Sequence, residues 1–201
     1  MRQSIEFWFD FVSPYAYIAA QSIEQLAAKY ERDVEWKPVL LGAVFKTTGS
    51  SPLTMRPPIM SSYFQHDFVR SARYAGVPFV MPEVFPIGTQ NTARICLWLQ
   101  NTAPQRVGEF VRGVTRTYFS GPAAINDLSW LHQYVSQMGL DGDAAVAACE
   151  NPQYKEALKT QCEQALSKGI FGAPWIIVDG EAFWGNDRLP QVEKWLATGG
   201  F

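Results

Sequence analysis

Ser13 is the residue whose type and position most clearly allow chemistry in this sequence. It precedes Pro14, at the end of an aromatic-rich strand pattern and at the start of a helix pattern. Serine is a favoured N-cap residue, and proline is tolerated at the first helical position. The first turn of a helix favours an anion through its free backbone N–H groups and its dipole. The sequence therefore predicts either a hydroxyl that binds an anionic group or a plain helix cap.

Other kinds of chemistry find less support. A serine hydrolase needs a histidine base, but His66 and His132 both fall in helical stretches, and no G-x-S-x-G motif occurs. The cysteines form no C-x-x-C pair, and no Cys/His cluster has the spacing of metal ligands. We therefore expect no bound metal, and free core thiols at Cys96, Cys149 and Cys162.

Composition limits the class of protein. The 201 residues are 47% hydrophobic and 18% charged, with a net charge of −2. They can form one domain, or one domain with an insertion, and they exclude a disordered tail. A near-neutral chain lacks the basic surface that binds nucleic acid, and no apolar run reaches the ~18 residues of a transmembrane helix. Residues 1–4 carry no secretory signal, so we expect a cytoplasmic protein with neither nucleic-acid nor membrane partners.

Strand patterns lie at the two ends of the chain. Residues 4–11 place phenylalanines on one face and Trp8 on the other, which is typical of a central strand covered on both sides. A helix over 13–30 and a strand over 34–40 complete a βαβ unit. Near the C-terminus, Asp179-Gly180 is a hairpin signal between two apolar runs. The predicted elements there are strands at 175–178 and 181–184 and a helix at 186–196.

The segment between these ends has no strand pattern. Residues 46–60 are rich in Thr, Gly, Ser and Pro and predict an irregular loop. Helical spacing follows at 61–75, 93–100, 107–119, 128–138, 143–149 and 154–168. The order βαβ, helices, ββα is the thioredoxin arrangement. We therefore predict an α/β fold, with a thioredoxin-like domain at 1–45 and 170–201 and an all-helical insertion at 46–169.

Four segments in this order resemble one family, the 2-hydroxychromene-2-carboxylate isomerases. These are bacterial relatives of kappa-class glutathione transferases and, more distantly, of the DsbA oxidoreductases. The resemblance covers essentially the whole chain, and it rests on FDFVSPYAY at 9–17, LLGAVFKTTG at 40–49, GIFGAPW at 169–175 and FWGNDRL at 183–189.

The resemblance implies glutathione as cofactor. Ser13 stands where the disulfide oxidoreductases of this fold carry their first cysteine, and Ser13-Pro14-Tyr15-Ala16 holds no thiol, which excludes dithiol exchange there. Ser13 would instead be the catalytic residue that stabilises the glutathione thiolate. Ala173, before a cis Pro174, would pair with the backbone of the tripeptide. The remaining cofactor-binding residues would be Asn186 and Asp187 at the γ-glutamyl arm, unless Asp187 only caps a helix, and Ser50.

The resemblance also implies a pocket for an aromatic substrate. Lys46 would lie near the substrate carboxylate, and aromatic side chains would line the pocket, among them Tyr15, Phe85 and Trp184. Many relatives have Asn where this chain has Ser50 and Gly88. They also carry a lysine in a Pro-x-Lys context, where Arg56 is here the only cation.

The implied activity is a glutathione-dependent isomerase of aromatic catabolism that forms a homodimer. It would interconvert 2-hydroxychromene-2-carboxylate and trans-o-hydroxybenzylidenepyruvate through reversible addition of the thiolate. Two alternatives use the same site. One is a kappa-class-like transferase that conjugates glutathione to electrophiles, and the other is a glutathione-binding module without catalysis.

Overall fold

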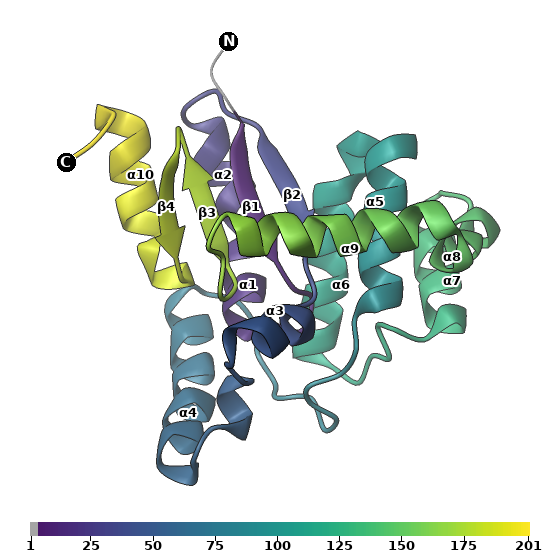
Figure 1. Ribbon diagram of the computed structural model, residues 1–201, viewed down its shortest axis with the longest axis horizontal. Coiled ribbons are helices and arrows are strands. Elements are labelled where there is room, and N and C mark those ends of the chain that lie inside the picture. The colour runs from purple at the N-terminus through teal and green to yellow at the C-terminus, as the bar shows by residue number, and fades with distance from the viewer. Residues whose placement is uncertain (1–3) are drawn as a thin grey trace.

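A four-stranded sheet lies at the centre of the computed structural model, which describes residues 4–201 (Figure 1). Residues 1–3 of the predicted N-terminal lobe lie outside the described part. The elements are, in chain order, β1 Ile5–Phe9, α1 Pro14–Ala20, α2 Ile23–Ala28, β2 Val34–Pro38, α3 Leu41–Thr48, the 3₁₀ helix η1 Leu53–Met55, α4 Pro58–Tyr74, α5 Gln90–Thr102, η2 Pro104–Arg106, α6 Val107–Ser120, α7 Leu128–Gln137, α8 Gly142–Glu150, α9 Pro152–Ser167, β3 Trp175–Val178, β4 Glu181–Trp184, η3 Asn186–Arg188 and α10 Leu189–Thr198.

The strands lie in the order β2-β1-β3-β4. β1 runs parallel to β2 and antiparallel to β3, and β4 returns antiparallel to β3. Trp8 of β1 is only 1% exposed, which confirms the central position that aromatic side chains on both faces predicted. Asp179 and Gly180 both have positive φ, at 51° and 90°, as a two-residue hairpin turn requires. The predicted hairpin is therefore confirmed.

Aromatic rings join the sheet to the helices. Phe7 and Phe9 pack edge-to-face on Trp36 of β2, with ring centroids 5.1 and 5.7 Å apart. Phe11, just beyond β1, packs in the same way on Phe110 of α6 at 5.9 Å. Edge-to-face pairs add to the stability that burial of their apolar area already gives. One continuous core therefore connects the strands to the helical part of the chain.

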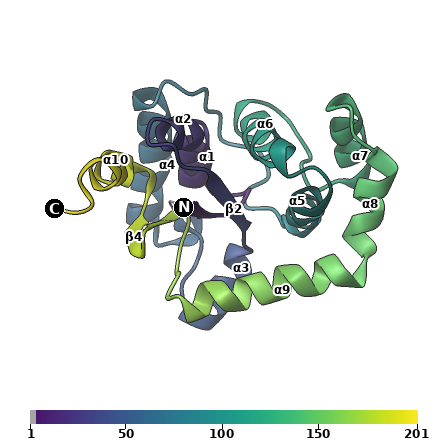
Figure 2. The same ribbon diagram turned by 90° about the horizontal axis from the view of Figure 1, so that it is seen from above.

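Every element described between Leu41 and Ser167 is helical, as the sequence predicted. Figure 2 shows α1 and α10 on one side of the sheet, α9 across the other, and α5 to α8 gathered beside it. Whether the helical part is a separate domain stays a prediction. No helix in the described range is long and apolar enough to cross a membrane.

Two local predictions are wrong. The helix predicted over 13–30 breaks into α1 and α2, because Ser22 leaves helical geometry at φ −126° and its N–H returns to the Ala19 carbonyl. The loop predicted over 46–60 holds the last turn of α3, η1 and the start of α4. Its glycine and prolines mark helix boundaries, since Gly49 ends α3 in the left-handed conformation and Pro58 is the first residue of α4.

Candidate functional site

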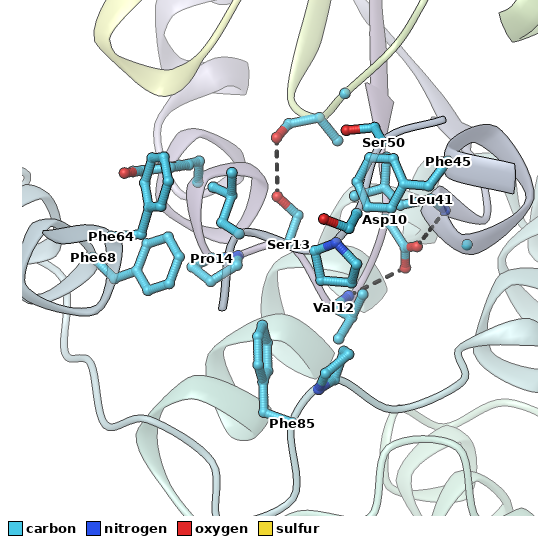
Figure 3. A pocket seen from close by; sticks show the side chains of 18 of the residues that line it. Asp10, Val12, Ser13, Pro14, Leu41, Phe45, Ser50, Phe64, Phe68 and Phe85 are labelled. Atoms are coloured by element: carbon cyan, nitrogen blue, oxygen red, sulfur yellow. Dashed lines mark hydrogen bonds between the residues drawn. The ribbon is translucent and has the colours of Figure 1, made fainter. Parts of the chain in front are cut away.

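A cleft of about 980 Å³ opens between the sheet, α3, α4 and the segment before α5 (Figure 3). This volume lies at the upper end of the range for small-molecule sites. Most of the predicted site residues line it, namely Ser13, Tyr15, Ser50, Phe85, Ala173, Trp184, Asn186 and Asp187. Lys46 and Pro174 are not among the residues that line it.

Ser13 caps α1 and faces Ala173 (Figure 3). Its Oγ accepts the Ala16 N–H at 3.2 Å and donates to the Ala173 carbonyl at 3.0 Å. The Ala173-Pro174 bond is cis, as predicted. Ser13 thus acts as a helix cap and also stands in the cleft. Because it takes one N–H of a seven-residue helix, α1 offers less to an anion than its sequence suggested.

Asp10 is a cleft residue that our sequence analysis missed. It is 2% exposed, and it accepts the Leu41 N–H at 2.8 Å, the Val12 N–H at 3.2 Å and the Thr89 hydroxyl at 2.6 Å. Burial raises the pKa of this carboxyl, against the effect of these hydrogen bonds. The available signal was a carboxylate that interrupts the aromatic residues at 7–11.

A cation that the sequence analysis did not assign to the site lies in the cleft beside Ser50. Arg56 donates from Nη2 to the Ser50 hydroxyl at 2.7 Å. Its Nε is buried and has no hydrogen-bond partner among residues 4–201. Lys46, predicted at a strand-to-loop transition, lies instead exposed in the last turn of α3. The structure therefore brings Arg56 into the cleft and leaves Lys46 outside it.

Tyr15 forms part of the wall on the α4 side. Its hydroxyl donates to Asp67 Oδ2 at 2.5 Å, and its ring packs edge-to-face on Phe68 at 5.0 Å. Asp67 also pairs with Arg70. Burial and the bond to Asp67 raise the pKa of Tyr15. The Tyr15 hydroxyl therefore donates its proton to Asp67, and Tyr15 contributes the face of its ring to the wall of the cleft.

The opposite wall is also aromatic. Phe171 packs edge-to-face on Trp184 at 4.6 Å and on Trp175 at 4.9 Å, and the Trp184 side chain remains half exposed. Phe85 enters from the segment before α5. Flat faces on several sides suit a flat aromatic ligand.

Asp187 and Asn186 lie at one edge of the cleft, in η3 rather than in the final helix. Asp187 Oδ2 lies 3.4 Å from Nη2 of Arg188. The side chain of Asp187 makes no capping bond, and α10 begins only at Leu189. The geometry gives the Asp187 side chain no capping role, and its role in ligand binding stays a prediction.

The histidines and cysteines do not join this site. Neither His66 nor His132 lines the cleft, so Ser13 has no histidine base there. The three cysteines are free and buried, and burial raises the pKa of each thiol. Residues 4–201 contain no group of three His, Cys, Asp or Glu side chains that could hold a metal ion. The cleft therefore offers hydroxyls, the two cations Arg56 and Arg188, and carboxylates among aromatic rings.

A family model described as a DSBA-like thioredoxin domain matches residues 4–197. The chain belongs to this family. It is 28% identical to glutathione S-transferase kappa 2 of Caenorhabditis elegans, over 98% of this chain and 92% of that protein. It is 27% identical to 2-hydroxychromene-2-carboxylate isomerase of Sphingobium xenophagum, over 98% and 99% of the two chains.

Solved structures show the same DSBA-like fold. The structure of a 2-hydroxychromene-2-carboxylate isomerase superposes with a TM-score of 0.87 at 23% identity, over 97% of this chain and 95% of the other. The thioredoxin fold with helices between its two strand-rich ends, predicted from the sequence, is thereby confirmed. Relatives with two different names, an isomerase and a transferase, share this architecture over nearly their full length.

Proposed function

We propose that this protein is a glutathione-dependent isomerase. Its substrates would be 2-hydroxychromene-2-carboxylate and trans-o-hydroxybenzylidenepyruvate, or a closely related aromatic pair. The observation that carries the proposal is the Ser13 hydroxyl, 3.0 Å from the carbonyl that precedes cis Pro174, in a cleft with no cysteine. The names of the relatives support it.

The charges of the cleft fit glutathione, which carries two carboxylates, one ammonium and one thiol. Arg56 lines the cleft, and its guanidinium can bind the glycine carboxylate beside Ser50. Asp187 can pair with the ammonium of the γ-glutamyl arm, next to Asn186. The backbone of Ala173 can hydrogen-bond the cysteinyl part, since a carbonyl has a second lone pair besides the one that Ser13 uses.

Ser13 supplies the hydrogen bond that the chemistry needs. Glutathione, when bound, supplies a thiolate that adds reversibly to the conjugated substrate, so that a double bond becomes a rotatable single bond. The Ser13 O–H can rotate away from the Ala173 carbonyl while Oγ still accepts the Ala16 N–H, so it would be free to donate to a thiolate held in the cleft. A hydrogen bond to a charged partner contributes about 1.5–3 kcal/mol. Ser13 therefore lowers the pKa of the bound thiol, and turnover follows the thiolate fraction.

The remaining residues position the substrate. Trp184 and Phe85 offer aromatic faces, and the Tyr15 ring, fixed by Asp67, closes the α4 side against water. Lys46 follows Phe45, which lines the cleft, and its long side chain can reach a substrate carboxylate at the mouth.

A titration of bound glutathione tests this proposal. Thiolate absorbs ultraviolet light where thiol does not, so the pKa of the bound thiol can be measured directly in wild type and in Ser13→Ala. We expect a pKa below that of free glutathione, and an increase of about one to two units in the variant. Equal pKa values for free and bound glutathione would favour a module without catalysis.

A kappa-class-like transferase is the second candidate, because two relatives that match 98% and 96% of this chain are named glutathione S-transferase kappa. Its thiolate site would be the same, and only the fate of glutathione differs: a transferase consumes one molecule per turnover, and an isomerase regenerates it. Our proposal includes a cytoplasmic location, which the unpaired cysteines favour.

We also propose a homodimer. Exposed apolar side chains on η1 and α4 support it, with Met55, Ile59 and Tyr63 exposed by 66%, 84% and 56%. Light scattering at micromolar concentration would reject the dimer if it gave the mass of a monomer.

A further inference from the structure

Asp10 is a buried carboxyl that the proposed chemistry leaves without a role. It lies between Phe9 and Phe11, is 2% exposed, and lines the cleft. Burial of a carboxylate is costly unless donors compensate it. The groups that donate to Asp10 are neutral, namely backbone amides and one hydroxyl. Burial of this carboxyl therefore costs stability, and the geometry of its hydrogen bonds points to its role.

Three segments converge on this one carboxyl. Oδ1 accepts the N–H of Val12 at 3.2 Å, in the turn between β1 and α1, and the hydroxyl of Thr89 at 2.6 Å, just before α5. Oδ2 accepts the N–H of Leu41, the first residue of α3, at 2.8 Å (Figure 3). Thr89 occupies the N-cap position of α5, yet its side chain makes no capping bond. Its hydroxyl bonds Asp10 instead.

Each of these segments carries a wall of the cleft. The backbone carbonyl of Asp10 accepts the Ser13 N–H at 2.9 Å, so the same residue holds the turn that presents Ser13. α3 contributes Phe45, and the segment before α5 contributes Phe85. Asp10 thus connects the turn that presents Ser13, through its backbone carbonyl, to two walls of the cleft, through its carboxyl.

We propose that Asp10 is a positioning residue. Its carboxylate locks the β1–α1 turn to the first residue of α3 and to Thr89, and thereby sets Ser13 opposite Ala173 and fixes the width of the cleft. The effect on turnover rests on the proposed function, whereas the lock itself exists in the free protein.

Protonation weakens the lock, because a neutral carboxyl accepts the two amide N–H groups less strongly. The titratable groups that face Asp10 are Tyr118 on α6 and Cys162 on α9. Both are neutral near pH 7, since burial raises the pKa of each, and neither supplies a counter-charge. Acidification therefore acts on the lock through Asp10 itself.

The lock can be tested in the free protein by NMR. The amide protons of Leu41 and Val12 should shift together as the pH falls, with one shared inflection above the ordinary aspartate value of 3.8. Asp10→Asn should abolish this shared shift, and Asp143→Asn, an exposed matched control on α8, should preserve it. Independent inflections at the two amides, or a shared shift that persists in Asp10→Asn, would overturn the lock.

Activity tests the positioning role. Asp10→Asn should lower kcat by about 10- to 100-fold, because a small displacement of Ser13 costs that much in rate. The KM for glutathione should rise far less. It should also remove the fall in kcat on the acid side of the pH profile. Unchanged kcat and an unchanged profile would overturn the proposal. Asp143→Asn should match wild type in every respect.

Thr89 provides a second test if Asp10→Asn does not fold. Thr89→Val removes one donor to Asp10, whereas Thr89→Ser keeps the hydroxyl. The valine variant should lose part of kcat and the serine variant should keep it; equal loss in both would overturn the lock. A wild type without isomerase or transferase turnover would reject the proposed function, while the amide titration would still decide for or against the lock.

Discussion

Ser13 Oγ donates a hydrogen bond to the carbonyl of Ala173, 160 residues away in the chain, at 3.0 Å. This contact joins the start of α1 to the segment that leads into β3. It also gives the hydroxyl two partners, because Oγ accepts the Ala16 N–H as well. The O–H group can rotate away from Ala173 without loss of the cap. Ser13 is therefore both fixed in place and able to donate to a ligand.

Ser13→Ala should lower turnover near neutral pH by about 10- to 100-fold, which is the kinetic equivalent of a hydrogen bond to a thiolate. Much of the loss should recover at alkaline pH, where the thiolate forms without help. The measurement is a pH–rate profile of both proteins at saturating glutathione. Two profiles of the same shape and height would mean that Ser13 serves only as a helix cap.

Ser13→Cys should not create a dithiol enzyme, because position 16 is alanine and the three native cysteines are buried. Thiolate at position 13 should attack oxidised glutathione, form one mixed disulfide and release one reduced glutathione. Intact-mass spectrometry should find a single glutathione adduct and no internal disulfide. Wild type provides the control, and an adduct of equal yield in wild type would contradict the expectation.

Arg56→Met and Lys46→Met should separate the two cations. Arg56 lines the cleft beside Ser50, so its loss should raise the KM for glutathione by about tenfold or more. Lys46 is exposed, so its loss should raise only the KM for the carboxylate substrate, by about two- to fivefold. Steady-state kinetics with each ligand varied in turn measures both. A higher KM for glutathione in Lys46→Met, with a higher KM for the carboxylate substrate in Arg56→Met, would contradict this assignment.

Asp10 should link stability to pH. Burial raises its folded-state pKa above the ordinary 3.8, so its favourable contribution is full below the unfolded pKa and is lost as the pH rises through the folded value. The free energy of unfolding of wild type, relative to Asp10→Asn, should therefore increase as the pH falls from 7 toward 4. Denaturant unfolding of both proteins at several pH values measures this. A difference that stays constant or decreases would show that the pKa is not raised.

Local patterns predicted the parts of the fold that depend on neighbours in sequence. The aromatic side chains on both faces of β1 indicate a strand at the centre of a sheet. The Asp179-Gly180 pair indicates a hairpin, because both residues tolerate the positive φ that the turn requires. α3 was missed, because its eight residues, which end in Lys-Thr-Thr, give a weak helical pattern beside a loop-like composition. The expectation that Lys46 lies near the substrate carboxylate came from the family resemblance, which does not show that this residue is exposed on α3.

The parts of the site that the sequence did not predict depend on contacts between residues far apart in the chain. The bond of Tyr15 to Asp67 spans 52 positions, and that of Asp10 to Thr89 spans 79. Periodicity along the chain carries no information about such pairs, since they depend on how distant elements pack. The resemblance to a family pointed to Ser13 and Ala173, whose segments could be recognised. It marked Arg56 as the only cation in a stretch where relatives carry a lysine, but it could not place this side chain in the cleft.

The fate of glutathione tests the central claim most directly. Wild-type protein would be given an aromatic substrate in large excess over glutathione, and free glutathione would be quantified as the product forms. An isomerase should convert many substrate molecules per glutathione, return all of the glutathione unmodified, and stop when glutathione is removed. Loss of one glutathione per product, with a conjugate of matching mass, or a rate that does not depend on glutathione, would contradict the account.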